Sequence, residues 1–153
     1  MAELNNCILP DGLYFAVQEN VWARDLGDGI VEMGMTDIAQ TMAGNIIHCR
    51  PKKVGSNLKK GRSVATVESG KWVGPVKSPF AGEIMEKNDA VEADAAMINR
   101  SPYKDGWIVR IKPDDMAGDL GAMVQGEAAI EGFRAYMAEN ELAGCIHCEG
   151  FEG

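Results

Sequence analysis

The sequence lacks the segments that mark membrane and nucleic-acid-binding proteins. No run approaches the roughly 18 apolar residues of a membrane-spanning helix, and the opening MAELNNCILPDG has no cationic stretch followed by an apolar one. Basic residues are in deficit, since 15 lysines and arginines face 23 aspartates and glutamates, a formal net charge of −8 over 153 residues. Such a charge repels phosphate backbones and anionic lipids. We therefore expect a soluble, cytoplasmic, monomeric protein that binds neither nucleic acid nor membrane and whose partner presents a basic surface.

Cysteine is also scarce. The chain has four cysteines, too few for a disulfide scaffold at this length, and we expect them to be reduced, with any disulfide a transient one. Cys49 lies in a predicted strand and is expected in the core. Cys145 and Cys148 have the spacing of a redox pair and are candidates for a thiol role, although they lie in the glycine-rich tail GCIHCEGFEG and not at the start of a helix.

An independent active site is not indicated. The chain has only two histidines, His48 and His147, and it lacks a phosphate-binding glycine loop and a nucleophile elbow. A zinc site would need scattered ligands in addition to the tail cysteines, so we expect no metal. These absences predict a protein that is not catalytic on its own.

Short alternating segments dominate the first three quarters of the chain. Each runs a few residues between glycine, proline or asparagine, a pattern typical of a small β-barrel or sandwich. The segments are GLYFAVQ, GIVEMGM, NIIHCRP, SVATVES, WVGPVKS, GEIMEKN and GWIVRIKP.

Two helices are predicted among these strands and after them. Thr36 can cap a short helix that runs through Ala43 and is ended by Gly44. Near the carboxyl end, Ile130, Phe133 and Met137 follow helical spacing. We divide the chain into an N-terminal segment (1–28), a central domain (29–115), a C-terminal helical region (116–143) and a flexible cysteine-containing tail (144–153).

The stretch VESGKWVGPVKSPFAGEI, residues 67–84, places one lysine at the tip of a predicted hairpin. Most lysines are solvated surface charges, but Ser69 and Gly70 supply the small residues of a tight turn, and the flanking strands would hold the ε-amine of Lys71 in solvent. A tethered cofactor needs such a rigid base and exposed stem. The stretches MAGNII (42–47) and FAGEIM (80–85) each open a strand with an Ala-Gly-X-Ile step, which predicts two half-domains related by a rough two-fold.

From about Gly29 to Asp115 the chain resembles the H protein of the glycine cleavage system and related lipoyl carriers. The matching stretches are GIVEMGMTDIAQTMAG, VGSNLKKGRSVATVESGKW, SPFAGEIMEKNDAV and INRSPYKDGWIVRIKP. The resemblance implies a mainly β fold, a barrel-sandwich hybrid of two antiparallel half-sheets with a short inserted helix and C-terminal helices. It also implies that Lys71 carries lipoate in amide linkage.

The same resemblance assigns roles to the neighbours of Lys71. Glu68 would be recognised by the ligase that attaches lipoate, while Ser69 and Gly70 set the turn. The Trp72 indole could lie against the dithiolane, dock on a partner or pack on the hairpin. A biotin carrier on the same fold fits less well, because biotin domains favour methionine on both sides of the lysine.

Departures from the glycine cleavage pattern point to a subfamily. Where those proteins have a His-Glu-Trp step, this chain reads QENVW (18–22), and Gly70 and Trp72 replace the usual valine and alanine around the lysine. The variant resembles lipoate-binding proteins of the sulfur-oxidising heterodisulfide-reductase-like system, which implies a sulfur-carrying arm with sulfurtransferases and that complex as partners. The alternative is an H protein carrying an aminomethyl group among glycine decarboxylase, aminomethyltransferase and dihydrolipoyl dehydrogenase. Either role requires a lipoate ligase or lipoyl synthesis enzymes.

Overall fold

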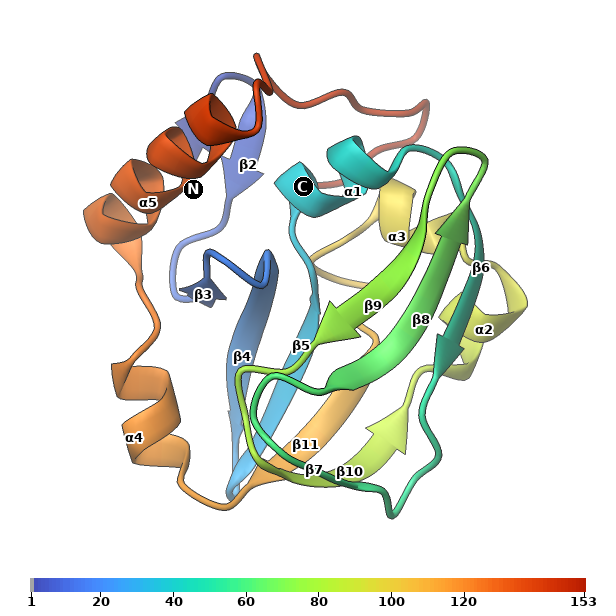
Figure 1. Ribbon diagram of the computed structural model, residues 1–153, viewed down its shortest axis with the longest axis vertical. Coiled ribbons are helices and arrows are strands. Elements are labelled where there is room, and N and C mark those ends of the chain that lie inside the picture. The colour runs from blue at the N-terminus through green and yellow to red at the C-terminus, as the bar shows by residue number, and fades with distance from the viewer. Residues whose placement is uncertain (1) are drawn as a thin grey trace.

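Three antiparallel sheets and five helices make up the computed structural model, which describes residues 2–153 (Figure 1). The six-stranded sheet has the order β3 (Tyr14–Ala16), β4 (Val21–Gly27), β5 (Ile30–Met35), β11 (Val109–Pro113), β10 (Gly82–Lys87) and β7 (Asn57–Leu58). The three-stranded sheet has the order β6 (Ile46–Pro51), β8 (Ser63–Ser69) and β9 (Val73–Lys77), and β1 (Ala2–Leu4) pairs with β2 (Cys7–Leu9). The expected mainly β architecture is confirmed.

The main core lies between the three-stranded and six-stranded sheets. The inward positions of β8 and β9 include Val67 and Val76, and both are buried, as are Met33 and Ile111 of the larger sheet. Burying each such side chain contributes roughly 1.5–3 kcal/mol relative to leaving it in water. Alternation of buried and exposed residues along β8 and β9 therefore fixes which face of the small sheet points outward.

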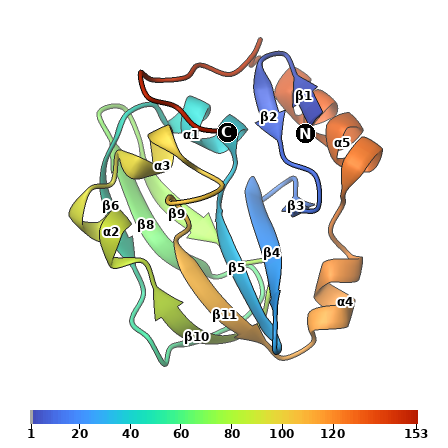
Figure 2. The ribbon, with the colours of Figure 1, turned by 180° about the vertical axis from the view of Figure 1, so that it is seen from behind.

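A second core cluster joins the two ends of the chain. Phe15 of β3 and Phe133 of the last helix meet edge to face with ring centroids 5.7 Å apart. Trp22 is fully buried and donates its indole N–H to the Pro102 carbonyl at 2.9 Å. The N-terminal strands and the last helix lie side by side in both views (Figure 2), so the two terminal regions belong to one packed layer.

The predicted helices are confirmed. Helix α1 (Asp37–Ala43) has Thr36 as its N-cap, whose Oγ1 accepts from the Ala39 N–H at 3.0 Å. It ends at Gly44, whose φ of 81° lies in the left-handed region that glycine tolerates. The C-terminal helix is α5 (Gly126–Glu139). Three short helices complete the set: α2 (Asp89–Ala93), α3 (Met97–Arg100) and α4 (Met116–Gly121).

The strand predictions hold for the centre of the chain and fail near the amino end. Strand β8 occupies residues 63–69 as predicted, and the two Ala-Gly-X-Ile steps lead into β6 and β10, which lie in different sheets. The alternating pattern does not predict strands β1, β2, β4 and β7. Strands β1, β2 and β7 are only two or three residues long, too short to show an alternation, whereas β4 is longer. Within the described residues no helix is both long and apolar enough to cross a membrane.

The carboxyl-terminal tail differs from its prediction. Instead of extending freely, residues 144–153 lie beside α1 and the β1–β2 pair. Cys145 forms a disulfide with Cys7, and the His147 Nε2 lies 2.7 Å from a carboxylate oxygen of the fully buried Asp37. The Ile146 N–H donates to Thr41 Oγ1 at 3.2 Å. The expectation of four reduced cysteines is therefore wrong for this structure, because the fold brings together two residues 138 positions apart.

Candidate functional site

The β8–β9 hairpin presents Lys71 at its tip. Glu68 opposes Val73 as the last regular pair, and beyond it the Ser69 N–H donates to the Trp72 carbonyl at 2.7 Å. The Ser69 hydroxyl oxygen accepts from the Lys71 N–H at 3.3 Å, so this buried serine braces the turn from inside. Gly70 faces open space. The predicted roles of Ser69 and Gly70 in forming the turn match this geometry.

The side chain of Lys71 is exposed, and its stem passes over the end of α1. A β-carbon placed on Gly44 would lie 3.0 Å from the Lys71 Cε and 3.8 Å from its Nζ. Gly44 therefore serves twice, since its left-handed backbone ends the helix and its missing side chain leaves room for the lysine stem. The stem has a defined base while its amine remains accessible to an enzyme.

Asn99 fixes the segment beneath this stem. Its side-chain amide donates to the Gly44 carbonyl and to Gln40 Oε1, both at 2.9 Å, and its Oδ1 accepts from the Ile46 N–H at 2.9 Å. Asn99 is buried, so these three bonds form away from competing water. Asn99, which belongs to the family-matching stretch INRSPYKDGWIVRIKP, thus holds the end of α1 and the start of β6 in place under Lys71.

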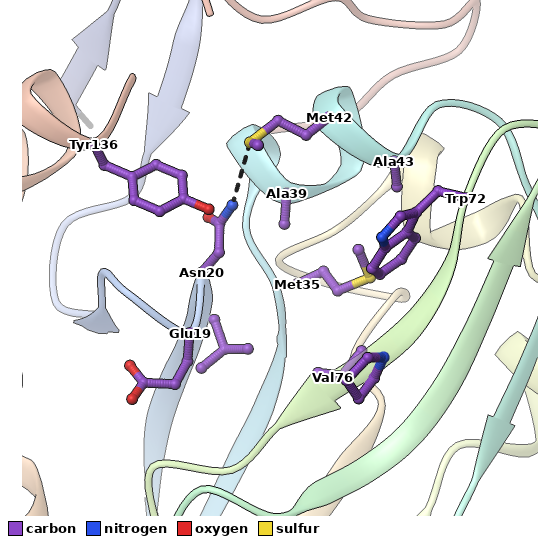
Figure 3. A pocket seen from close by; sticks show the side chains of 11 residues that line it. Glu19, Asn20, Met35, Ala39, Met42, Ala43, Trp72, Val76 and Tyr136 are labelled. Atoms are coloured by element: carbon purple, nitrogen blue, oxygen red, sulfur yellow. Dashed lines mark hydrogen bonds between the residues drawn. The ribbon is translucent and has the colours of Figure 1, made fainter. Parts of the chain in front are cut away.

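Trp72 turns away from the hairpin tip and forms one wall of a cavity of about 270 Å³ (Figure 3). Its indole is 38% exposed and lies over Gly74, where an added β-carbon would be 2.3 Å from the Trp72 Cζ2. Of the sequence alternatives, the indole therefore packs on its own hairpin. The cavity therefore lies beside Trp72, the residue that directly follows Lys71 in the sequence.

The other walls come from three separate parts of the chain. The turn before β4 supplies Glu19 and Asn20, helix α1 supplies Met42, and α5 supplies Tyr136, which in Figure 3 points toward Asn20. The Asn20 amide donates to the Met42 sulfur at 3.8 Å. The full lining is Glu19, Asn20, Val21, Met35, Ala39, Met42, Ala43, Trp72, Pro75, Val76 and Tyr136. Glu19 is its only charged member.

Most of these cavity residues could not be identified from the sequence alone. The QENVW segment was singled out only as a departure from a family pattern, and nothing in the spacing of α5 marks Tyr136. Glu68, the residue expected to be recognised by the ligase, is half-buried on the central strand, between His48 on β6 and Val73 on β9. It lies three residues from Lys71, on the outer face of the hairpin sheet.

The cysteines do not form the expected site. Cys145 is bonded to Cys7, so Cys145 and Cys148 are not a pair of free thiols, and the candidate joint role is corrected here. Cys148 is free and half-buried. Cys49 is buried as predicted, and desolvation, with a smaller contribution from Glu92, raises its pKa to about 12. No cluster of three potential metal ligands occurs among the residues described.

The tip of the hairpin thus presents one exposed lysine beside a mostly apolar cavity. The family model described as "Glycine cleavage H-protein" matches residues 13–134. The chain belongs to the glycine cleavage H-protein family, whose members are lipoyl carriers.

Individual relatives span most of the chain. A glycine cleavage system H protein 3 from Aquifex aeolicus is 43% identical over 149 residues, covering 95% of this chain and 92% of that protein. A probable glycine cleavage system H protein 2 from Saccharolobus solfataricus is 41% identical over 140 residues, covering 90% and 94%. The crystal structure of a glycine cleavage system H protein from Mycobacterium marinum aligns with a TM-score of 0.70 at 26% identity, covering 88% of this chain and all of that one. The similarity includes the fold.

Proposed function

We propose that this chain is a lipoyl carrier whose arm is attached to Lys71. One observation carries the proposal: the glutamate-serine-X-lysine motif folds into a braced turn that exposes the Lys71 amine while its stem rests on Gly44. The residues present fit the group, because the amine is free for acylation and the cavity beside Trp72 has room for an apolar chain. When attached, lipoate supplies a strained disulfide that opens to two thiols, able to accept electrons or to hold a group on sulfur.

Attachment requires an activated lipoyl group and an unprotonated lysine. The Lys71 Nζ lone pair attacks the carbonyl carbon of lipoyl adenylate, an amide bond forms, and AMP leaves while the amine loses its proton. The chain contributes the position of the amine, since the turn presents Lys71 exposed at the hairpin tip with its stem resting on Gly44.

The test is acylation of the apo chain by a lipoate–protein ligase with lipoate and ATP, followed by intact-mass analysis. We expect one lipoyl group per chain, none on Lys71→Arg, and normal addition to the control Lys112→Arg, whose exposed lysine lies on β11. Addition to another lysine, or addition of biotin by a biotin ligase, would contradict the proposal.

The cargo best supported is the aminomethyl group of glycine cleavage. The names of the relatives favour it, and so does the position of Glu19. An amine is cationic at neutral pH, and a carboxylate in the cavity wall favours a cation nearby. Glu19 belongs to QENVW, the segment that stands where the family pattern has a histidine. The cavity wall therefore carries a carboxylate here, and no imidazole is among its described lining residues.

Sulfur carriage is a second candidate, favoured by the polarisable aromatic and thioether side chains that line the same cavity. Trp72, Met35 and Met42 line it. A sulfur–aromatic contact with Trp72 is worth about 0.3–1.5 kcal/mol, and the thioethers of the two methionines are polarisable. In this role the partners would be sulfurtransferases and a heterodisulfide-reductase-like complex, as the sequence departures at Gly70 and Trp72 imply.

One experiment separates the two cargoes. The lipoylated chain is offered glycine with glycine decarboxylase in its oxidised, disulfide form, because the disulfide accepts the electron pair released when glycine loses carbon dioxide. In its reduced, dithiol form it is offered a persulfidated sulfurtransferase, and its mass is measured in both cases. Glycine-dependent mass gain alone supports the aminomethyl role, whereas sulfur gain alone supports the second. The Lys71→Arg chain, which has no arm, is the control for both.

A further inference from the structure

Positive charge is concentrated in residues 48–77, the segment of the sequence that contains the Lys71 hairpin. Residues 48–77 hold eight of the 15 basic residues and only one of the 23 acidic residues, Glu68. The rest of the chain has seven basic residues against 22 acidic ones. Although the protein as a whole is negatively charged, this segment, which includes the attachment lysine, has an excess of positive charge.

The cations of this region also differ in pairing. Elsewhere in the chain, five of the seven basic side chains have a carboxylate partner: Arg24, Lys87, Arg100, Arg110 and Arg134. Within residues 48–77, by contrast, the described structure gives an ion pair only to Lys60, which lies 2.7 Å from Asp119. The other seven are exposed to solvent. Cations that are exposed and unpaired within the chain remain available to carboxylates of another protein.

Strand register places two of them, Arg50 and Lys77, on one surface, which also carries Glu68. On the outer face of β6-β8-β9, Arg50 lies in the same row as Thr66 and Pro75, and Lys77 opposes Ser63. Nearer the hairpin tip the face is apolar, since Ile47 is 54% exposed and Val73 is 64% exposed. We call this surface the basic face, defined by Ile47, His48, Arg50, Thr66, Glu68, Val73, Pro75 and Lys77. It is continuous with Lys71.

We propose that the basic face is the docking surface for the ligase that attaches lipoate, which meets it with carboxylates around an apolar contact. The inference rests on the proposed lipoyl function, because an enzyme that acylates Lys71 must approach the hairpin. It differs from the expectation of a basic partner surface, which rests on the net charge of the whole chain. Nucleic acid fits less well, because exposed apolar side chains adjoin the cations and 22 acidic residues occupy the rest of the chain.

The test uses two double variants with the same change in net charge. Arg50→Glu with Lys77→Glu reverses the basic face, and Lys104→Glu with Lys112→Glu reverses two exposed cations elsewhere that likewise lack an ion pair among the described residues. Initial rates of lipoylation by the cognate ligase, with the apo chain varied, give kcat and KM. Binding to the ligase is measured separately by titration calorimetry at low and physiological ionic strength.

We expect the face variant to lose about tenfold or more in kcat/KM through KM, with kcat nearly unchanged, because steering charges act on encounter. Its binding should also lose most of its dependence on salt, while the control pair should change less than twofold. Equal rates for both variants would overturn the docking surface but leave lipoylation of the unaltered chain intact. Absence of any lipoylation of that chain would instead contradict the proposed function. Tight binding of a DNA duplex by the unaltered face would also overturn the inference.

Discussion

The Trp72 indole lies over Gly74, and this contact keeps the indole in the wall of the cavity beside Lys71. A β-carbon on Gly74 would come within 2.3 Å of the Trp72 Cζ2 and 2.7 Å of its Cε2. The φ of Gly74 is not among the positive ones, so alanine is compatible with the backbone and the conflict falls on the indole alone. Whatever occupies the cavity therefore meets an aromatic wall only because residue 74 has no side chain.

Gly74→Ala should expel the Trp72 indole into solvent. We expect a red-shifted tryptophan emission and stronger quenching by acrylamide, with a change in unfolding free energy of only about 0.5 kcal/mol because the residue lies at the surface. Gly70→Ala is the matched control, since an added β-carbon there meets nothing within 4 Å. An emission spectrum unchanged in Gly74→Ala would show that the indole does not rest on residue 74.

The disulfide between Cys7 and Cys145 should stabilise the protein by joining its two ends. Because it closes a loop of 138 residues, removing it enlarges the unfolded ensemble, and we expect a loss of about 2–4 kcal/mol. Denaturant unfolding of Cys7→Ser with Cys145→Ser measures the loss. Cys148→Ser, which removes a free thiol, should leave the midpoint unchanged. Equal stability of the two variants would contradict this assignment.

The features near Lys71 were predictable from sequence because they depend on local chemistry. The caps at Thr36 and Gly44 and the turn at Ser69 and Gly70 are set by neighbouring residues. The position of the tail was not predictable, because it depends on single contacts with distant residues, such as His147 with Asp37. The cavity is a similar case, since its walls come from four segments that meet only in the folded chain.

His147 should anchor the tail through the buried Asp37 carboxylate. That carboxylate accepts from the Ile8 N–H at 2.8 Å and from the Gln40 amide at 2.9 Å, and His147 Nε2 is its third partner. We expect His147→Ala to cost about 1–3 kcal/mol, because a buried acceptor loses a donor, and to speed proteolysis of the tail. Ile146→Ala, at a side chain that is 75% exposed, should do neither. Tail cleavage at the same rate in both variants would contradict an anchoring role.

Cys49 should make the protein sensitive to alkaline pH. Burial raises its pKa from 9.0 to about 12, so below pH 9 the thiol is protonated in both the folded and unfolded states and no difference arises. Above pH 9 the unfolded chain releases this proton while the folded chain retains it, and stability falls as pH rises. The loss from this residue reaches about 2 kcal/mol near pH 10.5.

The measurement that isolates this effect is the difference in unfolding free energy between the unaltered chain and Cys49→Ala from about pH 7 to pH 10.5. At neutral pH the variant should be the less stable, because it leaves a small cavity in the core. Above pH 9 the difference should shrink by about 2 kcal/mol, since alanine has no proton to lose. A pH-independent difference for Cys49→Ala would show that its thiol ionises as readily in the folded chain as in the unfolded one.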